Sequence, residues 1–233
     1  KIEYGIDLGT TNSAIARIEN GVSNILEIDN SKTVPSVVLY DRKDNCQVGI
    51  RALNTNKPKF VEFKRDMGME CLTDSPEAKL QNGTLITAEI LSTEVLKKLA
   101  EGVNDEILKS VVVTVPAMFE VGQIEATKRA AKMAGFEQIE ILMEPVAAAT
   151  AFAMKNIGKN GIWLVFDFGG GTFDASIVKV DEGIMKVTAS EGDNRLGGGD
   201  LDRAMINKIL LPEIKKNFNL DGLSEDEQKA INK

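Results

Sequence analysis

Two short segments place an aspartate and a glycine-rich turn at the end of an apolar strand. The first reads Ile-Asp-Leu-Gly-Thr-Thr over residues 6–11, and the second reads Phe-Asp-Phe-Gly-Gly-Gly-Thr over residues 166–172. Glycines let a backbone approach a ligand closely, and successive N–H groups in such a turn form a cradle for an anion. Two cradles that face each other would hold a polyphosphate from both sides.

The aspartates of these segments, Asp7 and Asp167, would meet in this arrangement. Two carboxylates at close range need a cation between them, and Mg²⁺, which keeps several of its waters, suits that position. An ordinary glycine hairpin would explain either segment alone, but a hairpin needs no aspartate at a fixed place before it. The repeated pattern therefore favours a magnesium–phosphate site over two unrelated turns.

The chain contains no histidine among its 233 residues. This excludes an imidazole general base, a Ser-His-Asp or Cys-His nucleophile and a His-ligated zinc site. The two cysteines, Cys46 and Cys71, lack metal-ligand spacing, and we interpret them as small apolar residues in a reducing compartment. The chemistry must then rest on Asp, Glu, Lys, Thr and a hard metal ion.

Composition and motif spacing exclude several other classes. The sequence has no Gly-x4-Gly-Lys-Ser/Thr loop, and the glycines at 169–171 lack the third glycine of a dinucleotide fold and lead into a strand. The net charge of −7 argues against nucleic acid or an anionic membrane as the main partner. No apolar run is long enough to span a bilayer and no leader is evident, so we expect a cytoplasmic protein.

The elements that position the two turns follow from hydrophobic periodicity. Each turn lies in a strand–turn–strand–hairpin–strand unit, and Asn20 with Gly21 forms the first hairpin. Between and after the two units we predict strands at 111–115 and 139–142 and helices at 87–100, 124–134, from Pro145 onward and at 200–218. The duplication predicts paired α/β lobes. Residues 1–160 would form the first lobe with an inserted subdomain, and residues 161–233 would begin the second.

Four motifs occur in an order that resembles the DnaK-type family of seventy-kilodalton heat-shock chaperones, and they lie at residues 5–13, 115–117, 144–149 and 166–174. The resemblance covers essentially the whole chain. It implies the actin-like (ribonuclease H-like) α/β fold with duplicated lobes, the first complete and the second truncated. It also implies ATP binding and slow hydrolysis that switch a chaperone between weak and strong peptide binding. Most adenosine contacts and the peptide-binding domain would then lie beyond residue 233.

The resemblance assigns roles to matching residues. Asp7 and Asp167 would hold Mg²⁺ through its waters, with Glu144 and Asp174 as outer carboxylates and K⁺ as a further candidate ion. Lys64 would position the attacking water and balance charge in the transition state of phosphoryl transfer, and Thr172 is a further catalytic candidate that would contact the phosphates. The residues that would contact the phosphates of ATP or ADP are Gly9, Thr10, Thr11, Asn12, Gly169, Gly170, Gly171, Thr172, Gly197 and Gly198. For Gly197 and Gly198, a plain turn at a helix start is an equal alternative.

Three positions depart from the family pattern. Ile124 and Glu140 stand where the family usually has arginine, and Gly199 stands where it usually has an acidic residue. The first two belong to the coupling with a J-domain cochaperone, so we expect that coupling to be weak. A nucleotide exchange factor is a further candidate partner, and client peptides would bind through the C-terminal domain outside this chain.

Two other functions of the same superfold stay open at this stage. A sugar kinase would place a carboxylate base over a sugar hydroxyl and would phosphorylate glucose or glycerol. An actin-like filament protein would sediment in an ATP-dependent way. The helix start at Glu144 and Pro145 and the spacing of Asp174 favour the chaperone over both.

Overall fold

The computed structural model describes residues 4–101, 103, 110–155 and 160–218 of the chain. Its elements, in chain order, are β1 (Tyr4–Asp7), β2 (Asn12–Glu19), β3 (Val22–Ile25), β4 (Val34–Pro35), β5 (Val38–Tyr40), β6 (Cys46–Val48), α1 (Ile50–Leu53), η1 (Phe63–Asp66), α2 (Ala88–Glu101), β7 (Ser110–Val115), α3 (Val121–Met133), β8 (Gln138–Met143), α4 (Glu144–Lys155), β9 (Gly161–Phe168), β10 (Phe173–Asp181), β11 (Ile184–Asp193), α5 (Gly198–Met205), η2 (Ile206–Leu210) and α6 (Leu211–Asn217).

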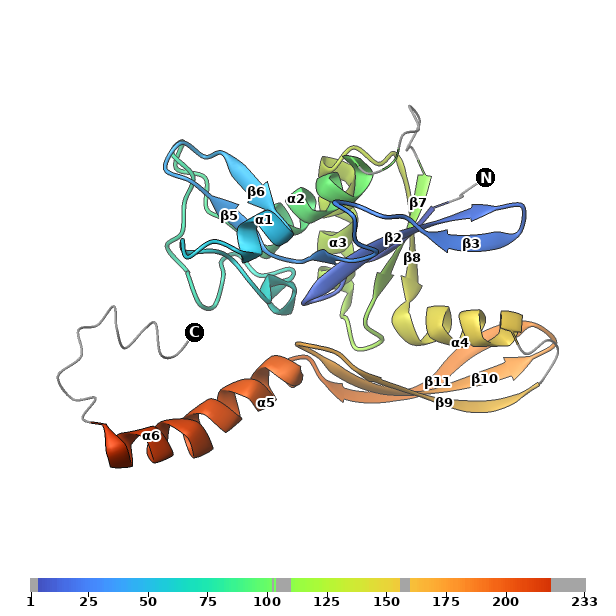
Figure 1. The fold of residues 1–233 in the computed structure, drawn as a ribbon. Coiled ribbons are helices and arrows are strands. Elements are labelled where there is room, and N and C mark those ends of the chain that lie inside the picture. The colour runs from blue at the N-terminus through green and yellow to red at the C-terminus, as the bar shows by residue number, and fades with distance from the viewer. Residues whose placement is uncertain (1–3, 102, 104–109, 156–159, 219–233) are drawn as a thin grey trace.

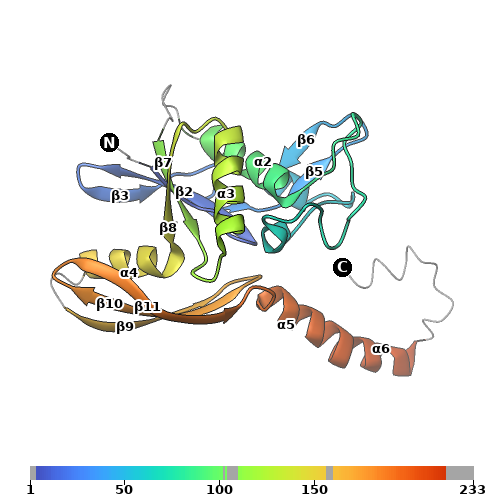
Figure 2. The same ribbon diagram turned by 180° about the vertical axis from the view of Figure 1, so that it is seen from behind.

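A mixed sheet with strand order β3-β2-β1-β7-β8 forms the centre of the first lobe, and β4 adds to the free part of β2. The β1–β2 pair is antiparallel, whereas β1–β7 and β7–β8 are parallel. The helices α2 and α3 pack together beside this sheet (Figure 2). Their apolar faces and the strand interiors make one core, in which Ile6, Leu96, Leu99, Val111 and Val113 are fully buried.

The second lobe begins with a sheet that repeats the first three strands. Its order is β11-β10-β9, all antiparallel, which matches β3-β2-β1 in the first lobe. Both outer hairpins turn through two residues with positive φ, Asn20 with Gly21 and Glu182 with Gly183. The duplication predicted from the two Asp-Gly segments is therefore present in the topology, and the α/β fold class is confirmed.

Helix α4 lies between the two sheets (Figure 1). Its Ala149 packs on Val178 and Val180 of β10, and Phe152 meets Trp163 edge-on with ring centroids 5.3 Å apart. A helix that we assigned to the first lobe therefore forms the inner cover of the second sheet. The lobe boundary at residue 160 stays a prediction, as does the extent of the second lobe, because residues 219–233 lie outside the described residues.

The last helix extends away from both sheets as a rod built from α5, η2 and α6 (Figure 1). The helix predicted at 200–218 is thus present and begins two residues earlier, at Gly198. Its middle, η2, is a π-helical turn just before Pro212. Proline has no N–H to donate to the preceding turn, which is a recognised cause of such irregularity. Over the described part of the chain, the helices are too short or too polar to cross a bilayer.

Candidate functional site

The two glycine turns meet at the base of the cleft between the lobes. The first glycine turn (residues 9–12) joins β1 to β2, and the second glycine turn (residues 169–172) joins β9 to β10. A Cβ added at Gly170 would overlap Thr11, with its Cβ at 2.9 Å, and one added at Gly171 would overlap Thr10. Only glycine permits this approach, so the facing arrangement predicted from the sequence is the one that the structure has.

Short hydrogen bonds hold the first glycine turn in place. Ser36 donates its hydroxyl to the carbonyl of Gly9 at 2.7 Å and its backbone N–H to the carbonyl of Thr11 at 2.8 Å. The Ser13 hydroxyl lies 2.8 Å from that of Ser36 and is buried with it. These bonds fix the carbonyl groups of Gly9 and Thr11 on the side of the turn that faces Ser36.

The second glycine turn is held from behind by the start of α5. The N–H groups of Gly198 and Gly199 donate to the carbonyls of Gly169 and Gly170 at 3.0 and 2.9 Å. Gly197 is buried so closely against Gly170 and Gly171 that any side chain there would overlap their backbone. In the described structure, Gly197 and Gly198 therefore lie behind the turn, and direct phosphate contact by them stays a prediction.

An open cavity of about 520 Å³ lies between the two turns and the start of α4. Most of the predicted site residues line it: Asp7, Gly9, Thr10, Thr11, Asn12, Lys64, Glu144, Asp167, Gly169, Gly170 and Thr172. Three alanines of α4 form its apolar wall. Residues that are 160 positions apart in the chain thus line one space, because both Asp-bearing strands end at it.

Lys64 is buried in the floor of this cavity. Its Nζ donates to Glu144 Oε1 at 2.8 Å and lies 5.6 Å from the centre of the Phe119 ring. Only 5% of its side chain is exposed, and 16% of that of Glu144. A lysine in this sequence context is usually solvated, so the burial comes from the tertiary fold. It places a fixed positive charge among the carboxylates of the cavity.

Burial and mutual repulsion raise the pKa values of three carboxylates at this site. Burial, followed by the charge of Asp7, raises the pKa of Asp167. Burial also raises the pKa of Glu144, although Lys64 opposes the shift. The pKa of Asp174 rises to about 6 because it is buried and lies near Glu144 and Asp167. Four carboxylates around a single ammonium leave an excess of negative charge that a cation would relieve.

The residues present fit a hydrated divalent cation. One oxygen of Asp174, Oδ1, is buried without a hydrogen-bond partner among the described residues. Within those same residues, no group of three or more Asp, Glu, Cys or His side chains converges at ligand distance. A cation that kept most of its waters would bridge such separated carboxylates, as Mg²⁺ does.

Sequence reasoning missed Thr114, which lines the same cavity from β7. Its hydroxyl donates to Asp7 Oδ1 at 3.2 Å and so orients that carboxylate. The available signal was its position as the one polar residue in the run Val-Val-Val-Thr-Val of a strand parallel to β1. The carboxyl ends of parallel neighbours meet at one edge of a sheet, where sites form.

Comparisons with known proteins match this sequence to a family. The family model described as "Hsp70 protein" matches residues 3–233. Chaperone protein DnaK of Mycoplasmopsis agalactiae is 43% identical over 225 residues, which cover 95% of this chain and 37% of that protein. DnaK of Metamycoplasma hominis is 41% identical over 225 residues, covering 93% and 36%. A chaperone protein HscA homolog of a Janthinobacterium species is 38% identical over 234 residues, covering 90% and 37%. The chain thus spans less than two fifths of the length of these curated relatives.

Proposed function

The chain belongs to the Hsp70 family, and from this premise we propose that it is the front part of a nucleotide-binding domain that binds and hydrolyses Mg²⁺-ATP. In the whole protein, the nucleotide state would control the binding and release of extended peptides in the cytoplasm. The observation that carries the proposal is the contact of the two glycine turns beside the carboxylate cluster around Lys64. The family match also disfavours a sugar kinase or a filament protein.

The cradle residues would bind the phosphates. Residues of both glycine turns line one cavity, and their free N–H groups, with the hydroxyls of Thr10, Thr11 and Thr172, would donate to phosphate oxygens from two sides. Bound Mg²⁺ would neutralise charge on the phosphates, with Asp7 and Asp167 accepting hydrogen bonds from its waters. K⁺ is a further candidate for the negative charge that remains.

Lys64 and Glu144 would act on the water and on the developing charge. The Nζ–Oε1 bond of 2.8 Å fixes the ammonium in the cavity, where it could hold a water molecule against the terminal phosphate. Fixed charges in a part-buried site need no reorganisation during the reaction, which is the main source of catalysis in phosphoryl transfer. Asp174 supports the cluster from behind, since it is buried and absent from the cavity wall.

Cochaperone partners belong to the same proposal. Glu140 is exposed on β8, and Ile124 of α3 packs against the core of the first lobe. An exposed carboxylate in place of an arginine would repel an acidic partner face. We therefore expect a generic J-domain to stimulate the ATPase weakly and Glu140→Arg to raise that response.

The decisive experiment replaces each aspartate of the glycine turns by asparagine in the full-length protein. Single-turnover hydrolysis of Mg²⁺-ATP should fall on the order of 100-fold for Asp7→Asn and for Asp167→Asn. The matched control is Asp181→Asn at the exposed far end of β10, which should hydrolyse at the parent rate. Parent-like hydrolysis by both site variants would refute the proposed magnesium site.

A second experiment separates binding from chemistry. Lys64→Ala should leave nucleotide affinity within a few fold of the parent and slow the hydrolysis step, because the proposed contact of Lys64 is with the water. Calorimetry and single-turnover kinetics measure the two quantities separately. A large loss of affinity with an unchanged rate of hydrolysis would overturn this role.

A further inference from the structure

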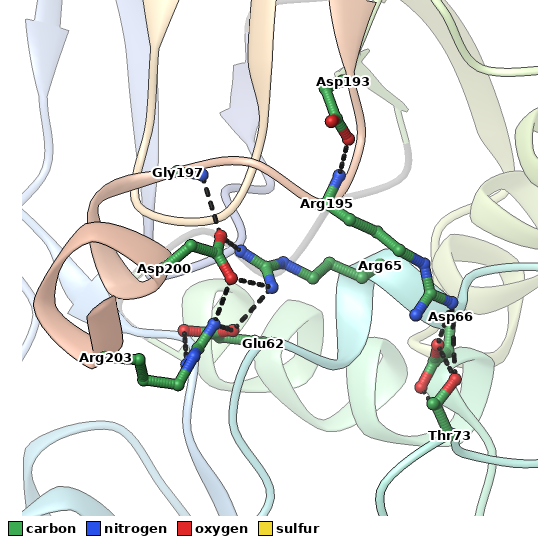
Figure 3. Close-up of polar contacts among 9 residues, drawn as sticks. All are labelled: Glu62, Arg65, Asp66, Thr73, Asp193, Arg195, Gly197, Asp200 and Arg203. Carbon is green, nitrogen blue, oxygen red and sulfur yellow. Dashed lines mark hydrogen bonds and ion pairs between the residues drawn. The ribbon is translucent and has the colours of Figure 1, made fainter. Parts of the chain in front are cut away.

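Three arginine–carboxylate contacts join two segments that lie far apart in the chain (Figure 3). One segment covers residues 62–73 of the first lobe, and the other covers residues 193–203 of the second. The contacts are Arg65 with Asp200, Arg203 with Glu62 and Arg195 with Asp66. Each segment supplies both signs of charge, so the two surfaces are complementary rather than simply opposite.

The inner contact, between Arg65 and Asp200, is the strongest of the three by geometry. Arg65 makes two bonds to the carboxylate, Nη2 to Oδ2 at 2.5 Å and Nη1 to Oδ1 at 3.2 Å. Its side chain is 13% exposed, against 49% for Arg203 and 55% for Arg195. Two parallel bonds in a part-buried place resist screening by salt better than exposed pairs do.

Asp200 also connects this pair to the second glycine turn. Its Oδ2 accepts the N–H of Gly197 at 2.9 Å, at the point where α5 begins (Figure 3). Gly197 packs against the backbone of Gly170 and Gly171, and the next two residues donate hydrogen bonds to that turn. A shift of the Asp200 carboxylate would therefore move the start of α5 and the turn together.

Arg65, from the first lobe, lies against both glycine turns. A Cβ built on Gly171 would lie 3.0 Å from Arg65 Nε and 3.0 Å from Thr10 Cβ. Arg65 therefore lies where the two glycine turns touch. It also follows Lys64 directly in η1, so its position and that of the buried lysine are set by one short helical turn.

We infer that Arg65 and Asp200 form an interlobe ion pair that positions the second glycine turn against the first, at the spacing that phosphate binding requires. The inference rests on the proposed nucleotide site and adds two positioning residues to it, neither of which lines the cavity. Arg203 and Glu62 form a second ion pair on the outer side of the first. Glu62 Oε2 lies 3.1 Å from Arg203 Nη2 and 3.1 Å from Arg65 Nη1. Because Arg203 is half exposed, its removal should have the smaller effect.

The first test measures the interlobe distance without nucleotide. Spin labels at Glu77→Cys and Lys208→Cys, both exposed, report the separation of the lobes by pulsed electron resonance in full-length protein without other cysteines. Arg65→Met and Asp200→Asn should each lengthen or broaden the distance distribution. The double variant should change the distribution by less than the sum of the two single changes, since each single variant already removes the Arg65–Asp200 contact. An unchanged distribution in both single variants would overturn the inference whether or not the protein binds nucleotide.

A matched control is available within the first lobe. Arg129 of α3 and Glu89 of α2 form a forked pair with a closest approach of 2.7 Å, and both belong to one lobe. Arg129→Met should leave the interlobe distance unchanged. A change as large as that from Arg65→Met would mean that any loss of an arginine pair loosens the protein, and the specific role of Arg65 would then be wrong.

The second test measures Mg²⁺-ADP binding by the same full-length variants. Arg65→Met and Asp200→Asn should each raise the dissociation constant about tenfold, and Arg65→Lys should recover part of it because one bond to Asp200 can form. Arg129→Met should change it less than twofold. Wild-type affinity in Arg65→Met would overturn the positioning role. Failure of the parent protein to bind any nucleotide would instead refute the proposed function and leave the distance result standing.

Discussion

The two lobes carry the same three-strand unit but bury it differently. In the first lobe, β1 lies between β2 and β7, and Ile6 at its centre is 1% exposed. In the second lobe, β9 is an edge strand of a three-stranded sheet, and Ile162, Leu164 and Phe166 on its outer face are 75%, 70% and 67% exposed. Within the described residues, the same alternation of apolar residues is therefore covered on both faces in the first lobe and on one face in the second.

The two glycine turns are also held by different neighbours. The second glycine turn is held by the start of α5, by contact with the first glycine turn and by the charged contacts to η1. The first glycine turn is held mainly by Ser36 and by the strands around it. The second turn is therefore held by α5 of its own lobe and, in addition, by charged contacts that reach the first lobe.

The largest expected effect compares one leucine in each lobe. Leu96 of α2 is fully buried in the core of the first lobe, whereas Leu164 points outward from β9. Leu96→Ala should lower the free energy of unfolding by about 2–5 kcal/mol, since it leaves a cavity. Leu164→Ala should change it by less than about 0.5 kcal/mol. Denaturant unfolding of residues 1–233 measures both, and an equal loss would contradict the difference in burial between the lobes.

A smaller effect is expected where the two turns touch. Gly170→Ala would push a methyl group into Thr11, so we expect a loss of about 1–3 kcal/mol in stability and weaker nucleotide binding in the full-length protein. Gly122 of α3 is the matched control, because a Cβ there meets nothing within 4 Å. Gly122→Ala should stabilise the chain by up to about 0.5–1 kcal/mol, as alanine favours a helix. Tolerance of Gly170→Ala would show that the turns can separate at little cost.

The smallest expected effect is a pH dependence of the interlobe pair. Hydrogen bonds from Arg65 lower the pKa of Asp200 from 3.8 to about 2, with Arg203 adding to the shift. A lowered pKa in the folded state means that the pair stabilises the fold fully above about pH 4 and that this contribution is lost as the pH falls toward 2. The difference in unfolding free energy between the parent and Asp200→Asn should shrink over that range.

The same measurement in an Arg65→Met background supplies the control. Without the guanidinium, the main cause of the low pKa of Asp200 is gone, so the effect of Asp200→Asn should vary much less between pH 4 and pH 2. An equally strong pH dependence in that background would place its origin elsewhere than in the Arg65–Asp200 pair.

Local patterns in the sequence predicted the longer strands and helices and the repeat, but none of the short elements between residues 34 and 66. Alternation predicted the strands, the hairpin at Asn20 and Gly21 has the positive φ that its residues favour, and Gly135 ends α3 with a φ of 105°. Some bounds differ, since α3 begins at Val121 rather than at residue 124. The side chain of Gln123 accepts the N–H of Glu120, and this cap lets the helix begin three residues earlier. Such patterns can be predicted from the sequence because each depends on residues within about four positions of one another.

The sequence alone also determined which chemistry is available, through the absence of histidine and the two Asp-Gly turns. The pairing of the remaining groups depends on the folded arrangement of the chain. Lys64 and Glu144 are 80 positions apart, and Arg65 and Asp200 are 135 apart. Neither pair can be predicted from the neighbouring sequence, because a lysine or an aspartate in such a segment can equally be exposed to solvent or paired. The Lys64–Glu144 pair forms only when the first lobe folds, and the Arg65–Asp200 pair only when the two lobes meet. Burial then makes an unpaired charge costly and so selects the pairing.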